Sequence, residues 1–162
     1  MESEAPGRTD TTGIIPPTEV KQLTGYELIK GIRDGIYPAP PISKVLNFQL
    51  AEIEPGRAVF TGKPSLEYYN PIGSVHGGFA ATLLDSCMSC AVHTTLPAGM
   101  GYTTLEIKVN FVRAILEDSG PLTAEGKVIS VGKRIGTAEG RLFDAQNRLY
   151  AHGTTTCLIF PL

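Results

Sequence analysis

The feature that most constrains this chain is an uninterrupted apolar segment near its middle. Residues 79–95 contain neither Pro nor Gly, and apolar side chains would cover most of the circumference of a helix formed there. A helix that is apolar on all sides is normally a buried helix. The sequence therefore predicts a central helix over about residues 78–95, with the remaining elements packed around it.

Charge is almost absent from this segment and its flanks. Between Asn70 and Leu105 the sole Asp, Glu, Lys or Arg is Asp85, although charged residues make up 19% of the chain. Burying an unpaired carboxylate is costly, so a lone Asp in an apolar segment needs a reason. Asp85 shares a narrow polar stripe with small hydroxyl residues, whereas a solvated stripe would usually carry several Lys or Glu. Asp85 is therefore the leading candidate for a functional side chain.

The rest of the chain reads as strands, apart from its N-terminal part. Residues 1–17 lack an apolar period and predict a disordered tail, and Thr18 can cap an N-terminal helix over about 18–33. Alternation of Leu105, Ile107, Val109 and Phe111 with polar residues predicts a half-exposed strand beginning near Thr103. Further strands are expected over residues 44–53, 57–64, 122–131, 136–144 and 149–160. This order favours an α+β fold in which an antiparallel sheet wraps around one buried helix.

Length and composition exclude several classes of protein. A chain of 162 residues fits one domain over 18–162 after the tail, and a net charge of −2 without a basic cluster argues against nucleic acid as a partner. Neither a membrane-spanning run nor a secretory leader is visible, so we expect a cytoplasmic protein without a membrane partner. The cysteines Cys87, Cys90 and Cys157 are expected to be reduced.

The residues before the central helix suggest a catalytic use for Asp85. Gly77 and Gly78 let a ligand approach the unpaired N–H groups at a helix start, which can polarise a carbonyl and stabilise an oxyanion. Asp85 follows Gly78 by two helical turns, roughly 10 Å along the axis. A carboxylate near a polarised acyl group could activate a water or attack directly. Both routes give acyl hydrolysis.

The run from Asn70 to Asp85, NPIGSVHGGFAATLLD, resembles the signature N-x-x-G-x-x-H-G-G-x-x-x-x-x-x-D of the hotdog-fold acyl-CoA thioesterases of the PaaI type. The resemblance extends over roughly residues 24–160. It implies a hotdog fold, an acyl- or aryl-CoA substrate, no cofactor beyond the CoA of the substrate, and sites at the interface of paired subunits in dimers or tetramers.

The resemblance also assigns residues to the site. It implies Asp85 as general base or nucleophile, the Gly77 N–H as the donor to the thioester carbonyl, and Asn70 and His76 beside it. For His76 we prefer a structural role, in which the ring fixes the turn by a hydrogen bond, and Asn70 is equally compatible with simply starting a turn. Some relatives take a hydroxyl from the neighbouring subunit, and Thr104 is the matching position, with Thr103 one residue away.

Substrate contacts are assigned more broadly. Cations should rim a site for the phosphates of CoA, and an acyl pocket along the helix would use its apolar wall, although ordinary surface charge and plain core explain the same residues. The candidates are Arg113, Lys133 and Arg134 for the phosphates and Gly78, Phe79, Leu83 and Met88 for the remaining substrate contacts.

Competing functions fit the sequence less well. Cys87 and Cys90 have C-x-x-C spacing, but no second ligand pair for a metal and no thioredoxin-like context accompany them. A hotdog enoyl-CoA hydratase would need acid and base groups where this chain has Tyr68 and Gly73. A module that senses acyl-CoA without cleaving it remains an alternative, and Asp85 argues against it because a sensor gains nothing from a charge in an apolar site.

Overall fold

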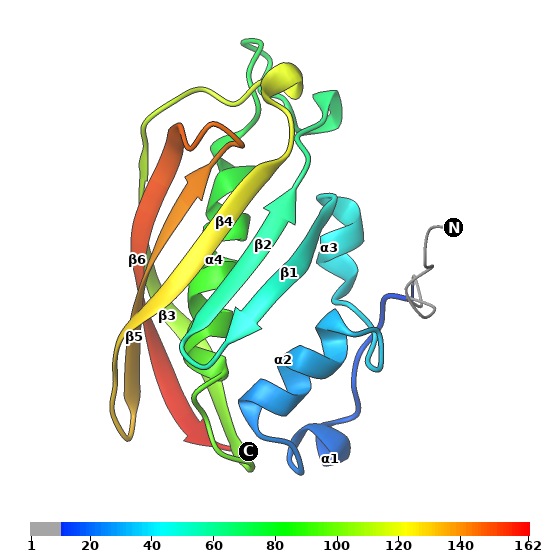
Figure 1. Ribbon diagram of the computed structural model, residues 1–162, viewed down its shortest axis with the longest axis vertical. Coiled ribbons are helices and arrows are strands. Elements are labelled where there is room, and N and C mark those ends of the chain that lie inside the picture. The colour runs from blue at the N-terminus through cyan, green and yellow to red at the C-terminus, as the bar shows by residue number, and fades with distance from the viewer. Residues whose placement is uncertain (1–10) are drawn as a thin grey trace.

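The computed structural model describes residues 11–162 and has one long helix held within a curved sheet (Figure 1). The helix, α4 (Gly77–His93), contacts all six strands. Its start is one residue from the expected position, and its last turn ends at His93, where Thr94 is the C-cap. The predicted central helix and the antiparallel sheet around it, the hotdog fold, are thus confirmed.

The sheet is antiparallel throughout, in the order β1-β2-β4-β5-β6-β3, so β1 and β3 form its two edges. Short 3₁₀ turns at Leu66–Tyr68 and Glu117–Ser119 lie in the connections. The strands are β1 (Phe48–Glu54), β2 (Arg57–Gly62), β3 (Met100–Phe111), β4 (Leu122–Val131), β5 (Ile135–Phe143) and β6 (Leu149–Pro161).

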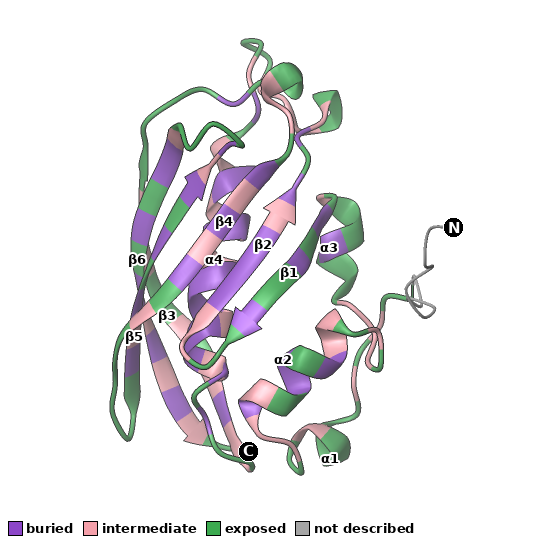
Figure 2. Ribbon diagram, in the orientation of Figure 1, coloured by how far each residue is buried: buried purple, intermediate pink, exposed green. Residues whose placement is uncertain are grey.

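Close contact between α4 and the sheet determines which residues fill the core. Buried residues concentrate on α4 and on the strands that lie across it (Figure 2). At Gly126 of β4 an added Cβ would lie 2.3 Å from the carbonyl oxygen of Cys87 and 2.6 Å from the amide nitrogen of Met88. Those atoms belong to the helix backbone and cannot rotate aside. Glycine at this position therefore sets how closely the helix can approach the sheet.

The N-terminal helix differs from the expectation of one helix over 18–33. Two helices occupy the region, α1 (Pro17–Val20) and α2 (Gly25–Arg33). The side chain of Thr24, not Thr18, caps α2 in a reciprocal pair with Glu27, because a cap at Thr24 satisfies the first free N–H groups of a new helix.

The expected tail is ordered over part of its length. Gly13 donates to the carbonyl of Ala39, and Ala39 donates to the carbonyl of Thr11. This segment of the chain therefore lies against the connector after α2, while residues 1–10 of the predicted tail lie outside the described part.

The first expected strand also begins later than predicted. Residues 41–45 form the short helix α3 (Pro41–Val45), and β1 starts at Phe48. Pro41 occupies the first helical position, where its missing N–H costs nothing and its fixed φ suits a helix. Pro41 thus starts α3, whereas α2 has already ended at Arg33, just before Gly35 adopts a positive φ of 74°. Within the described residues, no helix is long and apolar enough to cross a membrane.

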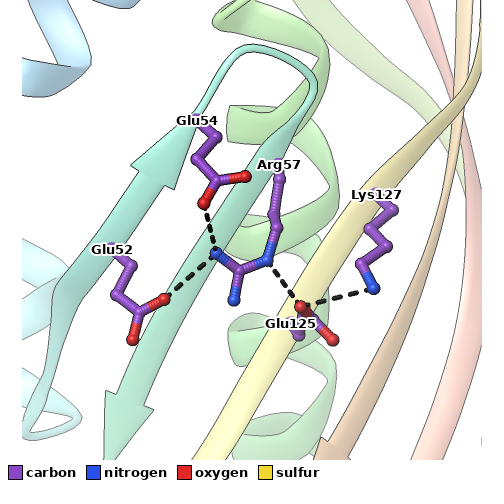
Figure 3. A network of polar contacts seen from close by, with 5 residues as sticks. All are labelled: Glu52, Glu54, Arg57, Glu125 and Lys127. Atoms are coloured by element: carbon purple, nitrogen blue, oxygen red, sulfur yellow. Dashed lines mark hydrogen bonds and ion pairs between the residues drawn. The ribbon is translucent and has the colours of Figure 1, made fainter.

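A charged network ties the β1–β2 hairpin to β4 on the side of the sheet away from α4 (Figure 3). The Arg57 Nε donates to Glu125 at 2.6 Å, and its Nη1 donates to Glu52 at 3.0 Å and lies 3.6 Å from Glu54. Lys127 reaches the same oxygen of Glu125 at 3.5 Å. The Arg57 guanidinium lowers the pKa of Glu125 against the opposing effect of burial. Arg57 of β2 thus forms ion pairs with residues of both neighbouring strands, β1 and β4.

We predict that Gly126→Ala destabilises the protein strongly, by roughly 2 to 4 kcal/mol. The added methyl would push the backbone of α4 away from β4. Gly132→Ala is the control, because its Cβ would meet nothing closer than the Ile135 carbonyl oxygen at 3.6 Å. Urea denaturation of both variants measures the difference, and equal midpoints would contradict the proposed close contact.

Candidate functional site

The start of α4 is organised by His76. His76 is the N-cap residue, and its Nδ1 accepts a hydrogen bond from the Gly78 N–H at 2.8 Å. This is the structural role that we preferred for His76. The hydrogen bond occupies Nδ1, the ring nitrogen that a general base would use. The ring therefore fixes the turn into the helix.

The Gly77 N–H is left free by this cap. Among residues 11–162 no acceptor pairs with it, and it is one of the first N–H groups of a 17-residue helix. An added Cβ at Gly77 would lie 3.1 Å from the ring of Phe111, so β3 comes close to the helix start. The N–H is available to a substrate oxygen.

Asn70 lies in the turn that leads to His76. Its N–H donates to the carbonyl of Ser74 at 2.7 Å, and its own carbonyl accepts from Gly73. The His76 N–H then donates to the carbonyl of Tyr68. The backbone of Asn70 thus forms the turn, and its side-chain amide has no hydrogen-bond partner among the described residues. Asn70 therefore starts a turn, as one of its two expected roles required, and its side-chain amide is available to bind a ligand.

Asp85 is half-buried on the side of α4 that carries its polar stripe, and Thr104 of β3 contacts it. The Thr104 Oγ1 donates to the Asp85 Oδ1 at 3.0 Å. Within the described residues the second carboxylate oxygen, Oδ2, accepts no hydrogen bond. The hydroxyl therefore orients the carboxylate and leaves one oxygen for another ligand.

The position of Thr104 corrects two sequence expectations. Thr104 and the expected inward residues Ile107 and Val109 point to the same side of β3, although simple alternation puts Thr104 on the opposite face. The register of β3 with β6 shifts between Thr104 and Glu106, and the extra residue, Leu105, reverses the alternation. The hydroxyl also reaches Asp85 within one chain, whereas we expected it from a neighbouring subunit.

Beyond Asp85 the polar stripe continues to Tyr102, which the sequence did not single out. The Tyr102 hydroxyl donates to Ser89 at 3.3 Å, and its ring lies 4.9 Å from the ring of His93. Burial raises the pKa of Tyr102 and lowers the pKa of His93 to about 4. Tyr102 could have been found from its place two residues before Thr104, on the same face of β3. The bulge at Leu105 hid this signal, because simple alternation puts both residues on the outer face of the strand.

The thiols of α4 are poorly suited to redox or metal chemistry. Burial raises the pKa of Cys87, and burial followed by the charge of Asp85 raises the pKa of Cys90 to about 12. Both cysteines and Cys157 are free. No group of three metal-ligating side chains occurs in the described part of the chain. Reactive cysteines require the thiolate, which these environments disfavour.

Three of the expected substrate contacts lie in the core. Phe79, Leu83 and Met88 are fully buried against the sheet. Leu83 and Phe79 lie over Gly62, and Met88 lies over Gly140. None of the three lines the cavity at the start of α4 that is described below, and their role in binding an acyl group stays a prediction. Gly78, by contrast, is at the helix start with its N–H on His76.

The expected phosphate-binding cations lie at two ends of the molecule. Arg113 lines a cavity of about 340 Å³ with Gly77 and Phe111, and its guanidinium lies 5.8 Å from the centre of the Tyr150 ring. Lys133 and Arg134 lie in the β4–β5 turn, next to Gly136, which packs on Val92 near the last turn of α4 (Figure 1). One chain therefore does not bring the three cations together.

We predict that neutral burial of His93 makes stability depend on pH between about 6.5 and 4. The unfolded chain takes up a proton near 6.5, whereas the folded chain keeps His93 neutral until about pH 4. Neutral His93 thus adds its full share to the free energy of unfolding above pH 6.5. That share is lost as the pH falls toward 4, by about 1 kcal/mol per pH unit. Comparing urea midpoints at pH 7 and 5.5 measures this.

His93→Gln should reduce that pH dependence. His152→Gln, at an exposed position on β6, is the control and should keep it. An unchanged slope in His93→Gln would show that other groups carry the effect.

Comparison with known proteins agrees with this architecture. Residues 72–151 match the model of the thioesterase superfamily. A Saccharolobus solfataricus protein that carries the name of an esterase, SSO2140, is 32% identical over 123 residues, which cover 76% of this chain and 86% of that protein.

Solved structures show the same fold. The PaaI protein of the Escherichia coli phenylacetic acid degradation operon is 20% identical with a TM-score of 0.73, covering 83% of this chain and 95% of that one. A phenylacetic acid degradation-related protein of Ralstonia eutropha JMP134 is 23% identical with a TM-score of 0.73, covering 80% and 98%. From the family match and the SSO2140 relative together, we conclude that this chain belongs to the thioesterase superfamily.

Proposed function

We propose that this protein hydrolyses the thioester of an acyl- or aryl-CoA, with Asp85 as the catalytic carboxylate. The observation that carries the proposal is the hydrogen bond from Thr104 to Asp85, the one Asp, Glu, Lys or Arg between Asn70 and Leu105. One oxygen is fixed by the hydroxyl, and the other is free to take a proton from water or to attack carbon. Superfamily membership supports thioester hydrolysis as the reaction class.

The Gly77 N–H is the proposed donor to the thioester carbonyl. Eight residues separate Gly77 from Asp85 on one straight helix, a rise of about 12 Å. A single thioester group is too small to contact both groups of one chain. The proposal therefore requires two chains, so that the Gly77 N–H of one subunit faces the Asp85 carboxylate of the other.

The free edge of β3 offers a place for such pairing. β3 is an edge strand, and its side chains Leu105 and Phe111 are 58% and 59% exposed. Long edge strands with exposed apolar residues tend to be covered by another chain. Twofold pairing of two β3 edges would set the two α4 helices antiparallel on one continuous sheet, which brings the start of one helix toward Asp85 of the other. Two such dimers could form a tetramer.

The same pairing would gather the cations. A twofold axis reverses the ends of the partner, so the Lys133 and Arg134 turn of one subunit comes to the end of the joint sheet that carries Arg113 of the other. Cations from both chains could then contact the phosphates of CoA. CoA enters as part of the substrate, and the proposal uses no separate cofactor.

Asp85, water and the Gly77 N–H account for every proton and bond in the proposed hydrolysis. As a general base, Asp85 takes a proton from a water whose oxygen forms a bond to the thioester carbon. Charge develops on the carbonyl oxygen, where the Gly77 N–H stabilises it. The carbon–sulfur bond then breaks, and the proton passes to the sulfur of CoA. Direct attack by Asp85 would form an anhydride that water opens, giving the same acid and thiol.

We predict that Asp85→Asn lowers kcat/KM by about 100-fold or more, because the amide cannot accept the proton of the attacking water. Release of free thiol from short, medium, long and aromatic acyl-CoAs measures this. Glu139→Gln, at an exposed carboxylate on β5, is the control and should retain activity.

Two results would contradict this function. If the wild type binds the acyl-CoAs and releases no thiol, the protein is a binding module. If folded Asp85→Asn keeps full kcat/KM, the carboxylate assignment is wrong.

Thr104 is a positioning residue in this account. We predict that Thr104→Val, which removes the hydroxyl at nearly constant shape, lowers kcat by roughly 10- to 100-fold with little change in KM. Thr104→Ser should restore most of the rate because it keeps the donor to Asp85. Steady-state kinetics of both variants measure this, and equal losses in Val and Ser would show that packing, not the hydroxyl, matters.

A further inference from the structure

A β-bulge in β3 lies directly beside the candidate site. The register of β3 with β6 shifts between Thr104 and Glu106, so Leu105 is an extra residue on β3. The bulge comes immediately after Thr104, the residue whose hydroxyl donates to Asp85. Bulges are common on edge strands and next to active sites, where they redirect a side chain. β3 is such an edge strand, with β6 as its neighbour (Figure 1).

The bulge decides which hydroxyl of β3 faces α4. Without the extra residue, the alternation that puts Ile107 on the inner face would continue to Leu105 and Thr103. Thr104 would then turn outward, and its hydrogen bond to Asp85 would be lost. Whatever holds the bulge in place therefore also holds the Thr104 hydroxyl on the carboxylate.

Two threonines of β6 hold the residue that follows the bulge. Thr155 is opposite Ile107 in the register, and its Oγ1 donates to the carbonyl oxygen of Glu106 at 2.9 Å. On the outer face the neighbouring Thr156 donates to Glu106 Oε2 at 3.3 Å. β6 thus holds Glu106 from both faces of the sheet, through its backbone on the inner side and through its side chain on the outer side.

A polar residue at the position of Thr155 is unusual on this face of the sheet. The residues that β4 and β5 direct at α4 are apolar, such as the fully buried Ala124 and Ala138, and Thr155 is itself only 1% exposed. Burying a hydroxyl is costly unless it is hydrogen-bonded. Cys157, the next inward residue of β6, is also buried, and its thiol is within hydrogen-bonding reach of the Thr155 and Thr104 hydroxyls. Cys157 thus connects Thr155 with the residue that orients the carboxylate.

We infer that Thr155 is a positioning residue, whose buried hydroxyl holds the carbonyl of Glu106 and so fixes the bulge that turns Thr104 toward Asp85. The inference rests on the proposed function, because the orientation of Thr104 affects the rate only if Asp85 is the catalytic carboxylate. Thr155 acts through the bulge and does not touch the substrate. Removing its hydroxyl frees the Glu106 carbonyl and lets Thr104 leave its orientation.

Steady-state kinetics test the inference, with the acyl-CoA that the wild type hydrolyses fastest. Thr155→Val removes the hydroxyl at nearly constant shape and should lower kcat by about 5- to 20-fold, with KM changed less than about twofold, because a misplaced catalytic group costs rate more than binding. Thr155→Ser keeps the donor and should stay within about twofold of the wild-type kcat. Equal losses in Val and Ser would overturn the inference.

Two further variants separate positioning from general packing. Thr137→Val is the matched control and should keep the wild-type rate, because the Thr137 Oγ1 donates to the carbonyl of Ser130 at 3.4 Å beside a different bulge, in β4. In the Thr104→Val background, Thr155→Val should cause no further loss, since both changes remove the same effect. Losses that multiply in the double variant, or a wild-type kcat in Thr155→Val, would overturn the inference.

A measurement without turnover separates this inference from the proposed function. Three-bond NMR couplings to the Thr104 methyl carbon report the χ1 rotamer of that side chain. Wild type, Thr155→Ser and Thr137→Val should share one rotamer, whereas Thr155→Val should show a different or averaged one. That result supports the role of Thr155 even if no thiol is released, and an unchanged rotamer overturns it even if acyl-CoA is hydrolysed. Thr155→Ala, which also lacks the hydroxyl, replaces Thr155→Val in both tests if that variant does not fold.

Discussion

Close packing between α4 and the sheet is the constraint on which the rest of this structure depends. At Gly126 the backbones of helix and strand approach so closely that a methyl group would overlap the carbonyl of Cys87. The helix face that meets the sheet must therefore be apolar and tightly fitted, as the full burial of Leu84 and Met88 shows. Polar chemistry on this helix is confined to the opposite stripe. Asp85 lies on that stripe, where Thr104 can reach it without disturbing the core.

Much of this arrangement could be predicted from the sequence because it depends on local signals. The length of α4, the position of Asp85 on its polar stripe and the His76 cap follow from periodicity and from residue types at a helix start. The shifted register at Leu105 could not be read from alternation, because it depends on pairing between β3 and β6. The split between α1 and α2 was missed for a local reason, since the cap at Thr24 competed with one at Thr18.

Features that depend on how elements assemble were not predictable. Phe79, Leu83 and Met88 are apolar residues on a helix, and only the curvature of the sheet around α4 decides that they are core. The cavity that Gly77 and Arg113 line arises from distant segments and has no signature in the sequence. The separation of the cations Arg113 and Lys133 likewise follows from the topology rather than from their spacing.

The proposed active site requires two subunits, because one helix holds Gly77 and Asp85 about 12 Å apart. In the proposed dimer each subunit would supply the helix start to one site and the carboxylate to the other. Two inactive subunits should then complement each other.

The most direct test is the activity of a mixed dimer, purified through two different tags, of one Asp85→Asn chain and one Gly77→Pro chain. Proline removes the Gly77 N–H yet suits the first helical position, and His76 already has the extended ψ of 137° that a following proline requires. Gly77→Ala keeps the N–H and controls for the added carbon atoms. A shared site predicts about half of the wild-type rate, since one of two equivalent sites is intact. A mixed dimer as inactive as both parents would contradict the shared site.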